Sequence, residues 1–219
     1  MDDVIIEKTQ KMIDSLKAVC REGGLSNSAG EYKIVTEVFL YKYLNDKFFF
    51  EVKKINPELK ENTEEKLSLL SAEEYELLLL ELPADTAKLK PEHFLSTLYN
   101  RKNEEKFSEV FDSTLLSLAD FNIDIFSVST ESAGKIRLFD AISPLVTDVG
   151  KRDFFCRALC DKLVEFSFEE VFSQKYDFFS TIFEYLISDY NKDSVFFGLH
   201  YKLCSNNKSS YCNSCSLVL

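Results

Sequence analysis

The sequence is poor in glycine and histidine, and this shortage excludes several classes of enzyme. The 219 residues include six glycines and two histidines. No glycine lies two positions from another, so neither a dinucleotide-binding fingerprint nor a P-loop is present. Neither His93 nor His200 lies in a Ser/His or Cys/His motif of a nucleophilic site, and we read His93 as a polar surface residue.

Long apolar runs are missing too. No window approaches the roughly 18 apolar residues of a membrane span, and the acidic start of the chain differs from the basic start of a signal peptide. We therefore expect a cytoplasmic protein that does not bind membranes. Its six cysteines should then be reduced. Two of them, Cys156 and Cys160, lie one helical turn apart and are read as core residues.

Negative charge is in excess. The chain has 26 basic and 37 acidic residues, a formal net charge of −11. Such a molecule repels free nucleic acid unless its basic side chains gather on one face. The many adjacent glutamates are read as solvated helix faces, not as acid/base pairs. The candidate DNA-facing residues, which have acidic neighbours, are Lys42, Lys47, Lys151 and Arg152.

Helical periodicity runs through most of the chain and predicts a compact all-α fold of about seven to nine helices. The wide apolar stripe of residues 29–54 predicts a central helix, and Ser71 with Glu74 fits a capping box. Residues 122–132 are expected to be a loop with a short extended piece, and 136–142 one or two helical turns. The other expected helices span 2–21, 75–82, 91–99, 104–119, 151–166 and 176–190, with a short turn at 168–172.

The last 25 residues differ in composition from the rest. Residues 195–219 contain no Asp or Glu and three of the six cysteines. This change predicts a helical domain over 1–194 and a separate Cys/Ser-rich tail, which is either an out-of-frame end or a genuine short module. The tail holds the best zinc candidates because of its Cys-x2-Cys spacing, although a flexible tail with exposed thiols is the preferred interpretation. These four candidates are His200, Cys204, Cys212 and Cys215.

Two blocks of the sequence resemble the modification subunits of type I restriction-modification systems. The first comprises residues 28–33 (SAGEYK) and 38–48 (VFLYKYLNDKF). The second is 177–191, with FEYL at 183–186, and is similar to the last helix before the catalytic domain in that family. The resemblance covers roughly 2–194 and implies the N-terminal helical domain of an adenine-N6 DNA methyltransferase subunit.

The resemblance also implies which catalytic features of the family this chain lacks. Family members continue into a domain that binds S-adenosylmethionine through a glycine-rich loop and carries an Asn/Asp-Pro-Pro-aromatic motif. Here the nearest match is Asn56-Pro57-Glu58, which lacks the second proline and the aromatic residue that stacks on a flipped adenine. By this resemblance the chain has no Rossmann-like methyltransferase domain, and alone it has no cofactor and no methyltransferase activity. It would reach DNA only within a complex of modification and specificity subunits.

Three functions remain open. The first is a truncated helical domain that helps to enclose DNA and to assemble the subunits. The second is a free-standing decoy or inhibitor of a defence nuclease, of the anti-restriction or anti-CRISPR kind. The third is a small metal-binding regulator built on the tail cysteines. A missing catalytic domain would leave an apolar surface exposed, and a homodimer that buries this surface is a further option. The predicted interaction residues, which cannot share one helical stripe, are Phe178, Phe179, Phe183 and Tyr185.

Overall fold

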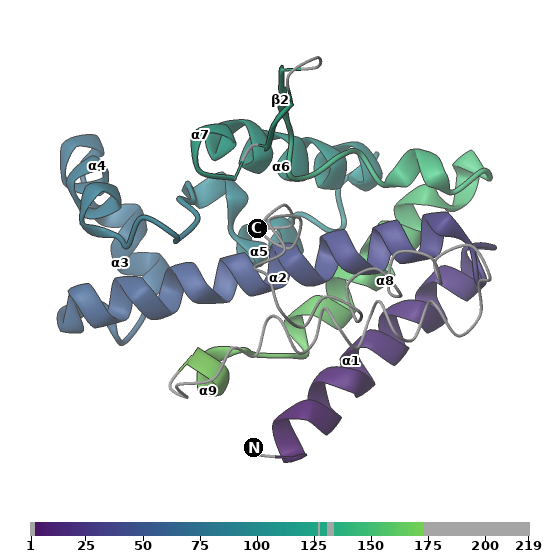
Figure 1. The fold of residues 1–219 in the computed structure, drawn as a ribbon, viewed down its shortest axis with the longest axis horizontal. Coiled ribbons are helices and arrows are strands. Elements are labelled where there is room, and N and C mark those ends of the chain that lie inside the picture. Colours follow the sequence, from purple (N-terminus) through teal and green to yellow (C-terminus); the bar gives the residue numbers. More distant parts are fainter. Residues whose placement is uncertain (1–2, 127, 131–133, 173–219) are drawn as a thin grey trace, which may run out of the picture. The chain divides into compact units, whose positions relative to one another are not determined.

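The fold is helical, as predicted. The computed structural model describes residues 3–126, 128–130 and 134–172, all of which belong to the first of two units of the chain, 1–175. In this part the chain forms nine α-helices and one two-stranded hairpin (Figure 1). The helix predicted over 176–190 and the boundary predicted after Ser194 lie outside the described residues.

The helices are α1 (Asp3–Glu22), α2 (Ala29–Ile55), α3 (Thr63–Leu69), α4 (Ala72–Glu81), α5 (Leu95–Asn100), α6 (Phe107–Phe121), α7 (Ile123–Phe126), α8 (Arg152–Val164) and α9 (Glu169–Phe172). The strands are β1 (Val128–Thr130) and β2 (Gly134–Ile136), and the 3-10 helices are η1 (Pro57–Leu59), η2 (Pro91–His93), η3 (Ser143–Leu145) and η4 (Val149–Lys151). In the hairpin, Val128 pairs with Ile136 and the strands are antiparallel. In the first half of the chain α1, α2 and α4 lie close to the predicted helices, whereas η1 and α3 were not predicted.

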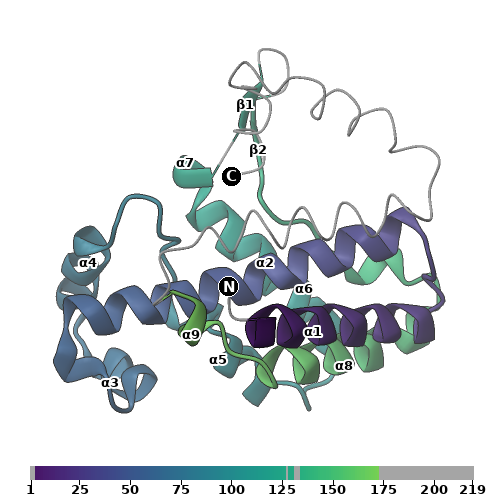
Figure 2. The ribbon, with the colours of Figure 1, turned by 60° about the horizontal axis from the view of Figure 1, so that its bottom comes forward.

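The central position predicted for residues 29–54 is confirmed by α2. The Ser28 hydroxyl caps this helix by accepting a hydrogen bond from the Glu31 N–H at 3.1 Å. Phe39, Tyr41 and Phe48 are fully buried along its length. The helix packs against α1, α8, α9 and η1 (Figure 2). Burial on several sides explains why its apolar stripe is wider than that of a surface helix.

The prediction of one or two helical turns over 136–142 is wrong. Residues 134–136 form β2 instead, and the next helical turn is η3, from Ser143 to Leu145. The Asp112 carboxylate on α6 accepts hydrogen bonds from the N–H groups of Ile142 (2.9 Å) and Ser143 (3.0 Å). These N–H groups are therefore paired across the fold, and a local helix is not needed to satisfy them.

Residues 122–132 contain more regular structure than the predicted loop. The expected extended piece is present as β1, but the four residues before Ser127 form α7. Asn122 separates α6 from α7: its side chain accepts a hydrogen bond from the Lys88 N–H (2.7 Å) and donates to the Lys88 carbonyl (2.8 Å). A contact with a distant loop therefore sets this helix end.

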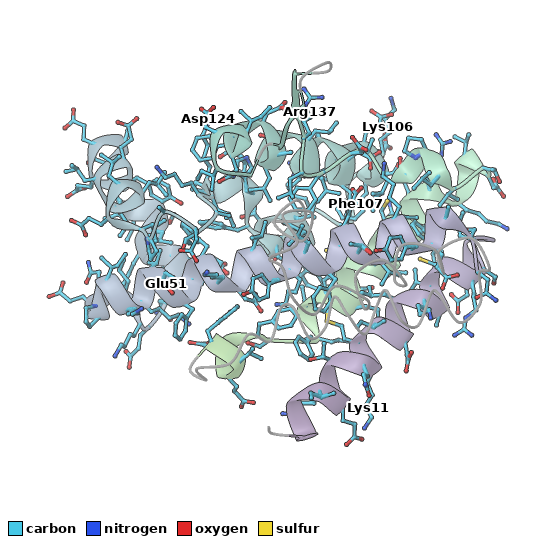
Figure 3. All side chains as sticks on the ribbon, viewed as in Figure 1. Lys11, Glu51, Lys106, Phe107, Asp124 and Arg137 are labelled. Carbon is cyan, nitrogen blue, oxygen red and sulfur yellow. The ribbon has the colours of Figure 1, made fainter. Side chains whose placement is uncertain are left out.

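In two of the predicted helices, a single residue with an extended or left-handed backbone changes where the helix begins. The helix predicted over 91–99 is divided into η2 and α5 because Phe94 is extended, with ψ of 137°. The helix predicted from Glu104 begins only at Phe107, since Lys106 has a left-handed backbone with φ of 56°. This turn directs Lys106 to the periphery and Phe107 to the inner side of α6, where it is fully buried (Figure 3).

His93 is buried, so the prediction of a polar surface residue is wrong. The turn begun by Pro91 places the ring in the core, where its exposed fraction is 0%. Its Nδ1 accepts a hydrogen bond from the Lys90 N–H at 3.2 Å, which leaves the Nε2 proton for the Ser117 hydroxyl at 2.9 Å. The Tyr41 hydroxyl donates to the His93 carbonyl at 2.9 Å. These bonds satisfy the polar groups that burial would otherwise leave unpaired.

Three cysteines of the described chain are core residues, which confirms this interpretation for Cys156 and Cys160. Together with Cys20 they are fully buried free thiols. Burial raises the pKa of the Cys20 and Cys160 thiols to about 12, and it raises the pKa of the Cys156 thiol further.

We expect these three thiols to resist labelling in the native protein, because the thiolate is the reactive form. A water-soluble disulfide reagent, followed by peptide mapping, should modify them only after a denaturant is added. Rapid labelling of any of the three in native buffer would contradict their burial.

The capping box predicted at Ser71 and Glu74 is confirmed. The Ser71 hydroxyl accepts a hydrogen bond from the Glu74 N–H (3.2 Å), and the Glu74 carboxylate accepts one from the Ser71 N–H (2.8 Å). Replacing Ser71 with alanine should lower the free energy of unfolding by about 1 kcal/mol, the usual cost of losing an N-cap. Urea unfolding measures this loss. The matched control is Ser68→Ala on α3, because Ser68 is exposed and caps no helix.

Candidate functional site

A cavity of about 650 Å³ lies where α2, the η1–α3 segment, the start of α5 and the segment between α8 and α9 meet. A cavity of this volume could hold a small ligand or a group of side chains from a partner. Its walls combine apolar and polar residues. The lining residues are Lys42, Asn45, Asp46, Phe49, Phe50, Lys53, Lys60, Asn62, Thr63, Glu64, Glu65, Leu95, Ser96, Val164, Ser167 and Glu169.

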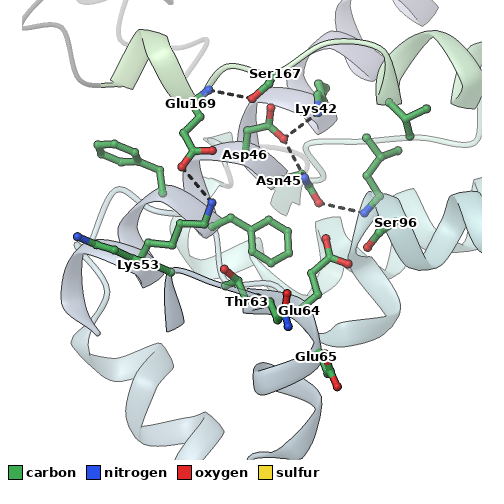
Figure 4. Close-up of a pocket in the computed structure, with 16 residues that line it drawn as sticks. Lys42, Asn45, Asp46, Lys53, Thr63, Glu64, Glu65, Ser96, Ser167 and Glu169 are labelled. Carbon is green, nitrogen blue, oxygen red and sulfur yellow. Dashed lines mark hydrogen bonds and ion pairs between the residues drawn. The ribbon is translucent and has the colours of Figure 1, made fainter. Parts of the chain in front are cut away.

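The α2 wall of the cavity is a polar network built from Lys42, Asn45 and Asp46 (Figure 4). The Asp46 carboxylate accepts from the Lys42 ammonium at 2.9 Å and from the Asn45 amide at 3.0 Å. Spacing of four residues along a helix places Lys42 and Asp46 on the same face. Both side chains are nearly buried, with 7% and 10% exposed, so the two charges neutralise each other inside the protein.

The same network holds two distant segments against α2. The Asn45 side-chain carbonyl accepts a hydrogen bond from the Leu95 N–H at 3.0 Å, at the start of α5. The second Asp46 oxygen accepts from the Phe168 N–H at 2.9 Å, just before α9. Phe168 is fully buried and contacts Phe39 edge to face, with ring centroids 5.2 Å apart. The polar residues of this wall therefore join segments of the fold.

The rim of the cavity is charged but nearly balanced. Across the rim, the Lys53 ammonium and the Glu169 carboxylate form an ion pair at 3.0 Å (Figure 4). Three lysines and four acidic residues line the cavity in total. Such a balance does not favour a phosphate or another strong anion. The Ser96 hydroxyl is the one lining atom among the buried polar atoms without a hydrogen-bond partner in the described part of the chain.

The arrangement of these side chains is not that of a nucleophilic or metal site. Within the residues that the structure describes, no group of three or more His, Cys, Asp or Glu residues could hold a metal ion. The single described histidine, His93, does not line the cavity. What the cavity can offer is a mixed apolar and polar surface next to the aromatic rings of Phe49 and Phe50.

The four candidate DNA-facing residues are engaged separately. Lys42 is buried with Asp46, and Lys47 forms an ion pair with Asp85 at 2.8 Å. Exposed Lys151 lies 3.7 Å from the Asp148 carboxylate, whereas half-buried Arg152 donates to the Val146 carbonyl at 3.0 Å. Two of these residues lie on α2 and two lie at η4 and the start of α8. Each has its own partner, so the structure does not join them in one patch.

The other predicted site residues lie outside the described part of the chain. These are the interaction residues Phe178, Phe179, Phe183 and Tyr185 and the zinc candidates His200, Cys204, Cys212 and Cys215. The interpretation of adjacent glutamates as solvated helix faces is confirmed at Glu73–Glu74 on α4 and Glu169–Glu170 on α9, which are exposed. Glu104–Glu105 are exposed too, but they lie in the turn before α6.

Sequence reasoning missed an exposed apolar surface on α4. Leu77 and Leu80 are 61% and 72% exposed, although Leu78, Leu79 and Leu82 beside them are buried. The signal was present in the sequence as a run of four leucines, which is too wide for one buried stripe of a helix. Three exposed glutamates share this side of the helix. We name the set of Glu73, Glu76, Leu77, Leu80 and Glu81 the acidic-leucine face.

The fold and the cavity define a small helical module whose buried polar residues connect its own segments. No family model, curated protein or solved structure matches the chain. No helix of the described residues is long and apolar enough to cross a membrane.

Proposed function

We propose that this chain is a non-catalytic helical domain of the kind that precedes the catalytic domain in type I modification subunits. In this proposal it acts by assembling with modification and specificity subunits, and it contacts DNA only as part of that complex. It binds no S-adenosylmethionine itself. Assembly of a cytoplasmic complex, not chemistry, is then its role.

One observation supports this proposal best. The first block of resemblance, residues 28–48, contains the N-cap and most of the buried part of α2. Its polar residues Asn45 and Asp46 bind the backbone of α5 and of the segment before α9. The residues that carry the resemblance therefore organise a helical domain. Such residues are expected in a part of an enzyme that positions other parts.

The acidic surface favours a second candidate, a decoy or inhibitor of a defence nuclease. Residues 56–85 contain nine acidic and two basic side chains, so 30 residues carry a net charge of −7 out of −11 for the whole chain. A nuclease has a basic groove for nucleic acid, and an acidic protein surface could occupy it.

Affinity purification of the tagged full chain from its native cells, followed by mass spectrometry, separates these candidates. Recovery of a specificity subunit or an intact modification subunit, absent with the tag alone, would support the first. Recovery of a nuclease without any modification subunit would support the second. Recovery of neither class of protein would count against both proposals.

A further inference from the structure

The acidic-leucine face of α4 is exposed on a helix that makes few contacts with the rest of the fold. In Figures 1 and 2, α4 lies beside the C-terminal end of α2, away from α1 and α8. One side of α4 is held by buried Leu78, Leu79 and Leu82, and by a hydrogen bond from the Tyr75 hydroxyl to the Leu89 carbonyl at 2.8 Å. The opposite side is left to solvent.

The spacing of the exposed residues gives this face a regular chemical pattern. Glu73 precedes Leu77 by four residues, and Glu76 precedes Leu80 by four residues. Residues four apart are neighbours on a helix surface, so each exposed leucine has a carboxylate beside it. Glu81 follows Leu77 at the same spacing. The result is an apolar centre with acidic edges, and an exposed apolar surface rimmed by polar groups is typical of protein interaction sites.

The carboxylates of this face are not used within the described part of the chain. Glu74 closes the capping box, but none of the ion pairs or hydrogen bonds found among the described residues involves the side chain of Glu73, Glu76 or Glu81. Exposed charges that a fold does not pair are available to a partner of opposite charge.

We propose that the acidic-leucine face is a docking site for a basic amphipathic helix of another protein. The leucines of such a helix would cover Leu77 and Leu80, while its lysine or arginine side chains would pair with Glu73, Glu76 and Glu81. This inference rests on the proposed function, since it supplies the surface and the chemistry through which the domain assembles.

Charge complementarity selects this occupant over two others. A second copy of the chain would bring another strongly acidic surface, because the net charge is −11, and the two would repel each other. The chain's own residues 176–219 hold three lysines and four acidic residues. Their net charge is therefore slightly negative, and they do not complement this face.

The test uses the full chain and a fluorescent synthetic helix of leucine and lysine, about 18 residues long, with its leucines on one face. Wild-type protein should bind it saturably. Leu77→Ser/Leu80→Ser and Glu73→Lys/Glu76→Lys/Glu81→Lys should each weaken binding by about tenfold or more. The two sets test the apolar and the charged contacts separately. All five residues are exposed, so circular dichroism should show an intact fold.

A matched control separates a specific site from general attraction between opposite charges. Asp14→Lys/Glu22→Lys/Glu105→Lys changes the net charge equally at exposed positions on α1 and before α6. It should leave the affinity within about twofold, and a scrambled peptide of the same composition should bind weakly. Equal weakening by the control triple variant, or unchanged affinity in both site variants, would overturn the proposal.

Two further results would assign the face to another occupant and overturn the proposal. One is a wild-type dimer, seen by sedimentation, that Leu77→Ser/Leu80→Ser converts to monomer. The other is a zero-length cross-link within a monomer from Glu73, Glu76 or Glu81 to a lysine of residues 176–219. The peptide result is independent of the affinity purification. Loss of site-specific peptide binding with recovery of a specificity subunit would therefore reject the docking site but not the proposed function.

Discussion

Replacing Asp46 with alanine is expected to lower the free energy of unfolding by about 3–5 kcal/mol. The substitution removes the counter-charge of Lys42, whose side chain is only 7% exposed. It also removes the acceptor of the Phe168 N–H. A buried ammonium without a partner and a buried N–H without an acceptor each carry a large desolvation cost. Urea unfolding followed by far-ultraviolet circular dichroism measures the loss.

Two variants show whether the loss comes from the buried network. Asp46→Asn keeps an acceptor for the Phe168 N–H but removes the charge, so its cost should be intermediate. Asp85→Ala breaks the ion pair with Lys47, in which the Asp85 side chain is 75% exposed. An exposed pair contributes about 0–1 kcal/mol, so this variant should remain close to wild type. A loss for Asp46→Ala no larger than that for Asp85→Ala would refute the structural role of the network.

The part of this fold that could be predicted from the sequence is the part set by local interactions. The α2 helix follows from its wide apolar stripe, and the start of α4 follows from two residues three apart in the capping box. In both cases the residues that set the structure are neighbours in sequence. Periodicity and cap chemistry report such interactions directly.

The misplaced elements depend on partners that are far apart in the chain. The Asp112 carboxylate that holds Ile142 lies 30 residues before it, and the Asn122 side chain that ends α6 binds Lys88, 34 residues away. No pattern within a short window contains this information. Helix ends and loops were therefore predicted less well than helix centres.

The cavity was missed for the same physical reason. The first block of resemblance was recognised by its order and spacing, but the use of Asn45 and Asp46 depends on Leu95 and Phe168, which are 50 and 122 residues away. Only folding brings these groups together. A polar pair next to the wide apolar stripe of α2 was the available signal, because buried polar side chains need partners.

His93 is expected to make the protein less stable in acid by up to about 3 kcal/mol. The pKa of its imidazole is lowered from 6.5 to about 4, chiefly because the ring is buried; Glu92 opposes this effect, and Lys90 adds a smaller lowering. The Nδ1 atom already accepts the Lys90 N–H, so a proton there would place two donors face to face. The folded protein therefore holds the ring neutral.

The direction of the pH effect follows from these pKa values. Below about pH 6.5 the unfolded chain binds a proton on this histidine, whereas the folded protein does so only below about pH 4. The stability that the folded protein gains from a neutral His93 is complete above about pH 6.5. It declines as the pH falls from about 6.5 to about 4 and is lost below about pH 4. Glu37 acts in the opposite direction, because burial raises the pKa of its carboxyl to about 7. Acid therefore favours the folded state at Glu37.

A comparison of variants isolates the histidine from Glu37. His93→Gln does not titrate, so its stability relative to wild type should improve by up to about 3 kcal/mol as the pH falls from about 7.5 to about 4. Glu37 is present in both proteins, so its effect cancels in the difference. His200→Gln is the matched control, since the chain has only these two histidines and this substitution leaves the buried His93 ring in place. A constant difference between wild type and His93→Gln across this range would show that the ring is not held neutral by the fold.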